Sequence, residues 1–526
     1  MGVVEAPPRE SRRWLLLLGA AILAGLVLRV WLASFAQTPG HGDSAFYYTV
    51  AKNIADGRGP VVDYIVYFFS GLLPLPHYAG DFWNPTASFL IAIPILLFGR
   101  SITAALLAPI LASIVPAAAT FLAARRYSTG SAAVASLATI LTFFSAFEVW
   151  FSVTTEAIIF AGAFGAMAIY FMIKRDASGR AFLFSAVFTG LANLIRQDNI
   201  LLLVTLESCI LLAAMPWRRR LSVACAALAI HLLVLSPLLA MNYSQMHVLF
   251  PPGPAKTAFL TSYEDFHSYN KQIDWETLRA TWGISGILKR RLHTAAENLR
   301  QVRYFLTPIL LVLLVAALAD LLIIHRNKDR LCALLPAAIF ALLEYGFYTI
   351  VASFSGPGSL IKSLAALMPF IAMAIVGMFA NFARSRLALV AAVCLLSAYS
   401  AYQGFTRNLN STLYYNTLYQ QYRTLRSLVL SDASSNRIDA ANITILARDV
   451  WDVYEGTGFK TVMVPNNDID TIVAVAQHYE ARYLLLPAER PQLDKVYSGL
   501  TPDPRIRFVA TVPGTELKLY RFEFSP

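Results

Sequence analysis

Charged side chains are scarce in this chain of 526 residues. Only 14% of the residues are Asp, Glu, Lys or Arg, whereas soluble proteins carry about 25%. Intrinsic disorder is excluded as well, because 57% of the residues are hydrophobic and 12% are aromatic, and that much apolar surface cannot stay hydrated. The composition is therefore typical of a polytopic membrane protein, in which each helical span needs about 20 apolar residues.

Cysteine is also rare, and the first apolar run is not typical of a cleavable signal peptide. The first apolar run, at about 14–36, is too long for a signal-peptide core, so we interpret it as a retained first span. The cysteines have no spacing typical of disulfides or of a metal site, and we interpret them as packing residues. All of them lie inside apolar runs: Cys209, Cys225, Cys332 and Cys394.

The net charge of +11 does not indicate a nucleic-acid partner, because the basic residues gather at the ends of apolar runs. Such clusters are the positive-inside signature that fixes the orientation of membrane proteins. The clusters are Arg12 and Arg13, Arg125 and Arg126, Lys174 with Arg175 and Arg180, Arg218 to Arg220, Arg326 with Lys328 and Arg330, and Arg384 and Arg386.

Eleven apolar runs are predicted to cross a cell membrane, which makes the fold mostly α-helical. A cytoplasmic N-terminus places every basic cluster on the inner side and the C-terminus outside. We therefore predict a transmembrane domain over residues 1–403 and a small extracytoplasmic α/β domain over 404–526. The spans are expected at about 14–36, 101–124, 130–150, 155–173, 181–195, 200–215, 221–241, 304–325, 331–352, 364–382 and 387–403.

One further segment, 82–98, is apolar enough to cross, but only Gly99 and Arg100 separate it from the next run. Counting it as a crossing would move later basic clusters to the outer side. We therefore expect a re-entrant or interfacial helix that is broken at Pro85 and Pro94.

From Asn442 onward, short β-like runs alternate with a helical stretch at 468–479. This alternation predicts the α/β domain, with a partly parallel sheet. The Gly-Thr-Gly at 456–458 is a single short turn and indicates no nucleotide cofactor. The expected strands are Ile443–Ala447, Thr461–Val464, Tyr483–Leu486, Ile506–Val512 and Leu517–Phe524.

Two long loops are predicted on the outer side, at about 37–81 and 242–303. In the second loop, apolar residues recur at helical spacing between Asp274 and Tyr304, accompanied by several Lys and Arg residues. A basic amphipathic helix of this kind lies along the lipid headgroups. The alternative is a solvated helix packed on the membrane domain, and the sequence favours neither.

Two carboxylates near the outer membrane surface are candidates for chemistry, since charge at that depth is costly. Asp43 follows the first span, and Glu156 stands between the third and fourth spans at a similar depth. Brought together, they could act as general base and partner, or as ligands of one divalent cation such as Mg or Mn. Each acid taken alone is more typical of a helix cap.

Two cations occupy comparable positions. Lys362 ends the Gly356–Lys362 stretch before a span that contains Pro369, and a cation beside exposed backbone amides suits a phosphate. Snorkelling of this lysine is the alternative. Arg196 with Asp198, at the outer end of the fifth span, is interpreted as a structural ion pair or as a second phosphate contact.

In this order, these features resemble the GT-C superfamily of integral-membrane glycosyltransferases. Within it they are most similar to the branch that contains protein O-mannosyltransferases and the lipid A aminoarabinose transferase. The resemblance covers about residues 14–405 and depends on the order and spacing of short motifs. These are Asp43 followed by Phe46, Tyr47 and Tyr48; Asn84-Pro85 leading to Leu97-Phe98-Gly99; Thr155-Glu156; Gly190 to Asp198; and Lys362.

The resemblance implies transfer of a single sugar from a polyprenyl-phosphate donor to a glycan, lipid or protein acceptor on the outer face. It assigns Asp43 as the general base, Glu156 as the second acid and Lys362 as the phosphate-binding cation. Attack in line with the leaving phosphate would invert the anomeric configuration, while the cation stabilises the growing charge. Two positions depart from the family: Ser44 stands where many relatives have an acid, and Asn84 where some have a lysine.

Because of these departures, other residues are candidates to complete the site. The phosphate could be held by Lys52, Arg58, His77 or Arg196. A divalent metal held by Asp43 and Glu156 stays open. Membrane lipids are expected partners. The donor or acceptor pocket is expected to include His41, Tyr47, Tyr48, His77, Asp81 and Asn84.

Two other functions are alternatives. A glycan polymerase or ligase of related architecture would move an oligosaccharide from a pyrophosphate carrier. A transporter or flippase would use charged residues inside the spans, although the sequence shows no internal repeat of the kind that transporters often have. The residues that would line such a pathway are Arg29, Glu148, Glu207, His231, Asp320 and Glu344.

Overall fold

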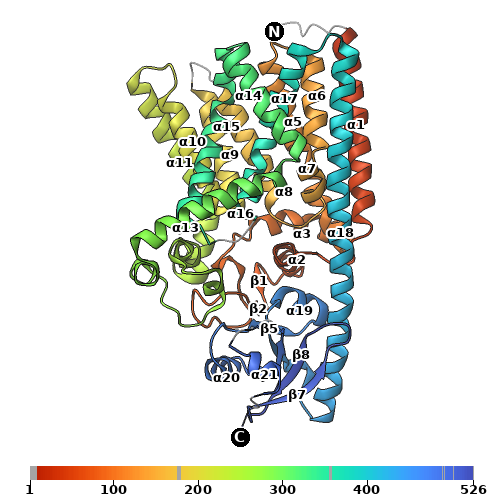
Figure 1. Ribbon diagram of the computed structural model, residues 1–526, viewed down its shortest axis with the longest axis vertical. Helices are drawn as coiled ribbons and strands as arrows, with labels where there is room; N and C mark the ends of the chain where they lie inside the picture. Colours follow the sequence, from red (N-terminus) through yellow and green to blue (C-terminus); the bar gives the residue numbers. More distant parts are fainter. Residues whose placement is uncertain are drawn as a thin grey trace.

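A helical bundle and a β-sheet form opposite ends of the molecule in the computed structural model (Figure 1). The structure describes residues 9–174, 179–354, 358–488, 490, 492–500 and 503–524. Arg175, Gly356 and Pro357, which belong to motifs named above, lie outside these residues. The segments of interest for function lie between the bundle and the sheet, where Figure 1 places α2, α3, α13 and α16.

Most of the bundle consists of apolar helices that pack side by side. Helix breaks fall where serine, glycine or proline offers a cap, as at Ser145, whose hydroxyl accepts from the amide of Glu148. The bundle helices are α1 (Arg9–Ala33), α4 (Ile102–Ala112), α5 (Ile114–Tyr127), α6 (Ala132–Phe143), α7 (Ala146–Phe151), α8 (Ile158–Lys174), α9 (Arg180–Ile195), α10 (Ile200–Leu211), α11 (Trp217–Met246), α14 (Pro308–Ala319), α15 (Lys328–Gly346), α17 (Met368–Phe382) and α18 (Arg386–Ser435).

Length and composition allow 6 helices, or up to 7 with one bent pair, to cross a membrane individually among the described residues. Four shorter apolar helices, including α8 and α9, accompany them. The predicted span at 130–150 is divided between α6 and α7. The structure thus supports a multi-span bundle, and the number of crossings stays a prediction.

The segment 82–98 forms one helix, α3 (Thr86–Phe98), and the predicted break at Pro94 is wrong. Pro85 directly precedes its first residue, and Pro94 lies inside it. A single missing amide hydrogen is tolerated where neighbouring helices pack against the helix, and α3 packs on both α2 (Gly42–Ala55) and α4. At 13 residues, α3 is about 20 Å long, which is short of the ~30 Å hydrocarbon core.

The sheet at the other end has 6 strands in the order β2-β5-β4-β6-β8-β7. Its three buried parallel strands are β4 (Thr444–Ala447), β5 (Lys460–Met463) and β6 (Tyr483–Leu486), while β7 (Ile506–Thr511) and β8 (Lys518–Phe522) run antiparallel. These strands lie where the sequence predicts them. The short helices α19 (Val450–Thr457), α20 (Ile469–His478) and α21 (Asp494–Tyr497) connect them.

One strand of this sheet comes from the first long loop, which the sequence did not predict. Strand β2 (Tyr64–Ile65) lies parallel to β5, with Tyr64 opposite Thr461. Two smaller strands of the same loop, β1 (Val61–Val62) and β3 (His77–Tyr78), pair with each other. The first loop and the sheet are therefore hydrogen-bonded into one structure.

Helix α18 continues through the predicted domain boundary at 403 without a break. Its 50 residues correspond to about 75 Å, and Figure 1 shows it running from the bundle to the far side of the sheet. It packs on α7 in the bundle and on α19 beside the sheet. A single helix thus links both ends of the molecule.

The predicted amphipathic helix is α13 (Trp275–Phe305), which kinks at Gly283 (φ 61°). It is bent by 105° relative to α14 and its short extension, and Figure 1 shows it lying across the bundle helices. Its exposed apolar side chains form a stripe that consists of Ile284, Leu288, Leu292 and Leu299. This stripe suits a membrane surface; its position along the headgroups stays a prediction.

Candidate active site at the junction of bundle and sheet

Asp43 is presented by the first turn of α2. The helix begins at Gly42, and the imidazole Nδ1 of His41 caps it by accepting from the amide of Asp43. Trp451 of α19 packs directly against Gly42, and only a residue without a side chain fits there. An added Cβ would lie 2.8 Å from the indole. Packing against the sheet end thus fixes where α2 starts, and with it the position of the Asp43 carboxylate.

Glu156 lies in the turn between α7 and α8 and is almost fully buried. Its neighbour Thr155 donates a 2.6 Å hydrogen bond to the backbone carbonyl of Ser44. This bond joins the Glu156 turn directly to the first turn of α2. The two acids, 113 positions apart in the chain, therefore lie at the same place in the fold.

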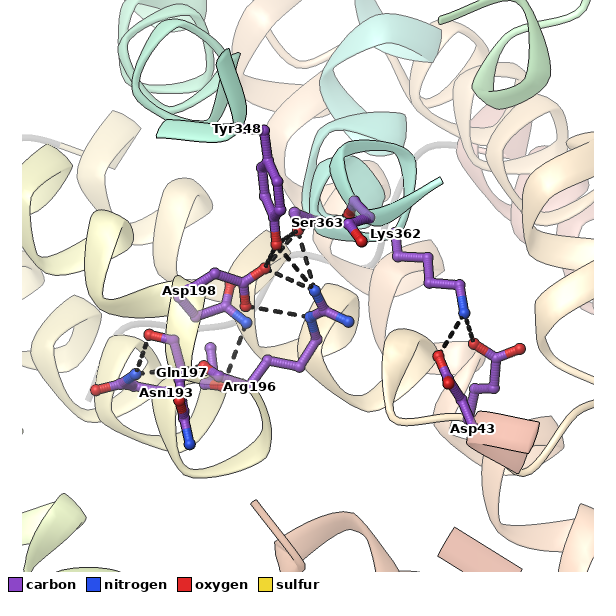
Figure 2. Close-up of polar contacts among 12 residues, drawn as sticks. Asp43, Asn193, Arg196, Gln197, Asp198, Tyr348, Lys362 and Ser363 are labelled. Atoms are coloured by element: carbon purple, nitrogen blue, oxygen red, sulfur yellow. Dashed lines mark hydrogen bonds and ion pairs between the residues drawn. The ribbon is translucent and has the colours of Figure 1, made fainter. Parts of the chain in front are cut away.

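Lys362 brings the two acids together. It belongs to the short helix α16 (Ser359–Ser363), and its Nζ lies 2.7 Å from Asp43 Oδ2 and 2.5 Å from Glu156 Oε2. Figure 2 shows the lysine chain extended toward Asp43. The ammonium group thus forms an ion pair with both carboxylates.

Small residues allow the segment after α16 to approach α8 closely. A Cβ added at Gly162 would lie 2.8 Å from the Cβ of Ala365, and one at Gly165 would lie 2.7 Å from the Cβ of Ala366. Because α8 follows Glu156 directly, this contact sets the distance between Glu156 and Lys362. Gly162 and Gly165 of α8 therefore help to position Glu156 relative to Lys362.

The charge of Lys362 dominates the acidity of Asp43. Burial acts to raise the pKa of Asp43, but the attraction of Lys362, assisted by His41, outweighs it and lowers the pKa to about 2. The carboxylate is therefore ionised at every physiological pH. It is also a weak base for as long as Lys362 stays bound to it.

A second charged cluster lies on the other side of α16. Arg196 forms a bidentate pair with Asp198, with N···O distances of 3.1 and 2.6 Å. Tyr348 donates a 2.7 Å hydrogen bond to Asp198, and Ser363 donates another. Figure 2 shows that consecutive residues Lys362 and Ser363 point to the two different clusters.

Arg196 keeps the carboxylate of this second cluster charged. Burial acts to raise the pKa of Asp198, but the charge and hydrogen bonds of Arg196 outweigh it and hold the pKa below its ordinary value. The pair therefore forms a fixed charged support for α16, as the ion-pair interpretation of the sequence expects. Arg196 also lines the cavity that has Asp43 and Glu156 in its wall.

Two cavities meet at the Lys362 cluster. The first, of about 510 Å³, is lined by Asp43, Glu156, Arg196 and Lys362, with aromatic walls from residues such as Tyr47. The second, of about 700 Å³, shares His41, Glu156 and Lys362 with the first and extends toward Trp150, Tyr304 and α18. Glu156 and Lys362 thus lie at the junction of the two cavities, and Asp43 lines the first.

The geometry does not suit a divalent metal held by Asp43 and Glu156. Mg and Mn require several oxygen ligands in an open shell, whereas the Lys362 ammonium stands between these two carboxylates. In the described part of the chain, no three His, Cys, Asp or Glu residues are grouped as metal ligands.

Several predicted pocket residues do lie at the cavities. His41 lines both cavities, and Tyr47 and Asn84 line the first. Asn84, which stands where some relatives have a lysine, donates to the carbonyl of Asn193 and accepts from Gln197. Its role in the structure is to connect α3 to the turn that carries Arg196.

Other predicted residues are held elsewhere. Lys52 forms a 2.7 Å ion pair with Glu455 of α19, and Tyr48 faces the same ammonium group. Arg58 pairs with Asp63 inside the first loop. Neither cation lines either cavity. Lys52 therefore serves the contact between α2 and the sheet end, and Arg58 serves the first loop, so neither is placed to bind a phosphate in a cavity.

His77 and Asp81 also lie away from the cavities. The imidazole Nε2 of His77 is 3.6 Å from Asp81 Oδ1, and the pair lies between β3 and the turn before α3. Neither residue lines the first or the second cavity. This pair is part of the packing of the first loop.

The sequence did not single out Tyr348 or Ser363, although both contact Asp198. Ser363 directly follows Lys362, which was the available signal. Tyr348 lies at the end of an apolar run and carries no motif. Aromatic residues of the second long loop, Tyr263 and Phe266, also line the first cavity and were not predicted.

One protein family is similar in sequence to part of this chain. The family model described as dolichyl-phosphate-mannose-protein mannosyltransferase matches residues 83–241. No protein with a curated description matches the chain. The matched segment includes Glu156, Arg196 and Asp198 and leaves out Asp43 and Lys362.

Solved membrane enzymes share the fold over almost the whole chain. ArnT from Cupriavidus metallidurans bound to undecaprenyl phosphate has 15% identity and a TM-score of 0.56, covering 97% of this chain and 98% of that chain. The same protein in the apo state gives a TM-score of 0.55 at 15% identity over the same shares. The apo oligosaccharyltransferase of Archaeoglobus fulgidus has 12% identity and a TM-score of 0.51, covering 91% of this chain and 70% of that chain.

These matches confirm the resemblance stated from the sequence. The likeness extends over the bundle and the sheet end together, since it covers 97% of the chain. The apolar helices and the membrane-protein relatives also establish a multi-pass membrane protein. The chain has the fold of the GT-C membrane glycosyltransferases and is similar to their branch of protein mannosyltransferases and ArnT.

Proposed function

We propose that this protein transfers a single sugar from a polyprenyl-phosphate donor to an acceptor hydroxyl on the outer face of the membrane. The observation that carries the proposal is the meeting of Asp43, Glu156 and Lys362 at the junction of two cavities. A base, a cation for the leaving group and space for two substrates are what such a transfer requires. The undecaprenyl phosphate bound to ArnT, a protein of the same fold, agrees with a lipid phosphate as one ligand.

The first cavity suits the sugar phosphate, because both Lys362 and Arg196 lie in its wall. The acceptor would enter through the second cavity, which shares Glu156 and Lys362 with the first. The donor chain stays in the hydrocarbon while its phosphate lies at the membrane surface. The second cavity also has Arg300 and Arg303 in its wall, so this assignment of the two cavities is part of the proposal.

In the reaction, Asp43 accepts the proton of the acceptor hydroxyl. The acceptor oxygen forms a bond to the anomeric carbon as the bond from that carbon to the phosphate oxygen breaks. The polyprenyl phosphate leaves with the bonding electrons, and Lys362 stabilises the charge that it gains. A single in-line displacement of this kind inverts the anomeric configuration.

The orientation of the site follows from the basic clusters. The N-terminus is cytoplasmic if the Lys and Arg clusters at the helix ends face inward. The sheet, which lies at the end of the molecule opposite the N-terminus (Figure 1), is then extracytoplasmic. The cluster of Asp43, Glu156 and Lys362 lies between bundle and sheet, at the outer membrane surface.

A transporter is a weaker alternative on structural grounds. Neither cavity is lined by Arg29, Asp320 or Glu344 or by the other charged residues that would mark a transport route. Arg29 is bound to Ser152 and to the carbonyl of Phe143, and Asp320 is bound to Asn381. These groups are used inside the bundle rather than along a continuous path.

The test is product analysis by mass spectrometry. Purified protein in lipid nanodiscs is given a panel of polyprenyl-phosphate sugars and acceptors of the three classes: glycans, lipids and peptides. The proposal expects a mass gain of one sugar, and NMR of the product should show an inverted anomeric carbon. Addition of an oligosaccharide from a pyrophosphate carrier would establish the polymerase or ligase instead, and solute uptake by reconstituted liposomes without any glycosyl product would establish a transporter.

A further inference from the structure

We propose that the donor phosphate competes with Asp43 and Glu156 for the ammonium group of Lys362, so that donor binding frees Asp43 to act as the base. This inference rests on the proposed function, which it deepens by fixing the order of events. Before the donor binds, Lys362 is held by two carboxylates at 2.7 and 2.5 Å. The cluster then has one positive and two negative charges.

The same ammonium group is accessible to a ligand. Lys362 lines both cavities, together with Glu156, and Asp43 lines the first. An ammonium group has three N–H donors, and the two carboxylates accept from it. A phosphate that enters the first cavity therefore meets a cation that is already shared by two other anions.

Only the side chain of Lys362 needs to move in this exchange. Its backbone is anchored because Ser363, the next residue, donates to Asp198 and also contacts Tyr348 at 3.0 Å. The helix α16 is thereby tied to the second charged cluster, as Figure 2 shows. A lysine has a flexible four-carbon stem, so its ammonium can turn between neighbouring anions while the helix stays in place.

The charges favour the exchange increasingly as the reaction proceeds. The sugar phosphodiester of the donor carries one negative charge, and the departing polyprenyl phosphate gains more. An ammonium group that moves toward this oxygen binds the transition state more strongly than the ground state. At the same moment Asp43 loses the cation that suppresses its basicity, which makes it a better proton acceptor.

The remaining surroundings of Asp43 do not replace Lys362. His41 lies on the same loop, with its Nδ1 at 3.9 Å from Asp43 Oδ1, and Arg196 is already paired with Asp198. The other groups near Asp43 are phenols, which carry no positive charge: Tyr47, Tyr67 and Tyr263. On the Glu156 side, the second cavity adds Tyr415 and, from α13, Glu297, Arg300 and Arg303. Burial therefore acts on Asp43 with less opposition once Lys362 has turned away.

The test measures binding of farnesyl phosphate, a short polyprenyl phosphate, by calorimetry on the full-length protein in nanodiscs. If the phosphate competes with the two carboxylates, Asp43→Asn and Glu156→Gln should each tighten binding by about threefold to tenfold, because each removes one competing anion. Lys362→Met should weaken binding at least tenfold. Asp56→Asn, at the other end of α2 where Asp56 pairs with Arg100, is the matched control and should leave the affinity unchanged.

The outcomes separate this inference from the proposed function. Weaker or unchanged affinity in both Asp43→Asn and Glu156→Gln, with melting temperatures near wild type, overturns the competition, as does wild type that binds no farnesyl phosphate. These results do not depend on turnover. Absence of sugar transfer from every donor would instead remove the proposed function and leave the binding result standing. Using two separate carboxylate variants keeps the test decisive if one of them folds poorly.

Discussion

The hydroxyl group of Thr155 donates a 2.6 Å hydrogen bond to the backbone carbonyl of Ser44. These residues are direct neighbours of Glu156 and Asp43, so one buried bond connects the two halves of the acidic pair. Its length is typical of a strong O–H···O bond. The relative position of the two carboxylates therefore depends on the side chain of a neighbouring residue, Thr155.

Replacing Thr155 by Val should expose this dependence. The shape is nearly kept, but the carbonyl of Ser44 loses its side-chain hydrogen bond, which costs about 1 kcal/mol of unfolding free energy. Misplacement of Glu156 relative to Asp43 should lower the transfer rate by about 10- to 100-fold. Thr154→Val is the matched control, since Thr154 bonds only locally to the carbonyl of Phe151; equal rates in both variants would contradict the prediction.

Removing the proposed base should slow the reaction strongly and leave the fold intact. Asp43→Asn keeps the size of the side chain and should reduce sugar transfer by about 10²- to 10⁴-fold. The measurement is a single-turnover assay with a radiolabelled lipid-linked sugar. Asp56→Asn on the same helix should retain wild-type turnover, and full activity of Asp43→Asn would exclude Asp43 as the base.

The close contact between α8 and the segment after α16 predicts an unusual pair of glycine effects. Gly162→Ala would place a Cβ 2.8 Å from Ala365 and should destabilise the protein by about 1–3 kcal/mol through overpacking. Gly19→Ala, in α1, meets nothing within 4 Å and should stabilise its helix by about 0.5–1 kcal/mol. Melting temperatures in one detergent should therefore shift in opposite directions.

The sheet end should become less stable as the pH rises. Burial, followed by the charges of Asp449 and Glu455, raises the pKa of Asp452 to about 8, whereas an unfolded aspartate has a pKa of about 3.9. The folded state therefore binds this proton more tightly. The stabilisation is complete below about pH 4 and is lost as the pH rises through 8.

Asp452→Asn should remove this pH dependence. The melting temperature of the variant should exceed that of wild type at pH 8.5 by more than it does at pH 5. Thermal melts across this range measure the difference, and the exposed Asp494→Asn is the control. A gap between Asp452→Asn and wild type that is the same at both pH values would contradict the raised pKa.

The charged support beneath α16 should be more important for stability than its hydroxyl groups. Arg196→Gln leaves the buried Asp198 without its cation, which typically costs about 3–5 kcal/mol. Tyr348→Phe removes one neutral donor from the same carboxylate and should cost about 1–2 kcal/mol. Chemical or thermal unfolding of both variants in the same nanodisc measures the two losses of stability. A larger loss in Tyr348→Phe than in Arg196→Gln would contradict the prediction.

The sequence predicted much of this site because its residues carry their own signals. Asp43, Glu156 and Lys362 are charged residues next to apolar runs, where charge is costly, and their order matches a known family. The structure brings all three together. The strands at the sheet end were also predictable, since their apolar runs are short and bounded by polar turns.

Contacts between distant segments were not predictable from local patterns. Lys52 was a candidate for the phosphate, but its partner is Glu455, more than 400 positions away. Strand β2 has 2 residues, too few for any periodicity to reveal. Pro94 was expected to break its helix, and only the packing of neighbouring helices around α3 explains why it does not.

The strand that the first loop contributes to the distal sheet has one more consequence. A protein shortened after α18 would lack β5, the neighbour of Tyr64 and Ile65, and would also lack the indole of Trp451 that seats Gly42. The first turn of α2, which carries Asp43, would then lose a packing contact that positions it. The C-terminal portion is therefore not a separable domain, because its contacts position the first turn of α2, which carries Asp43.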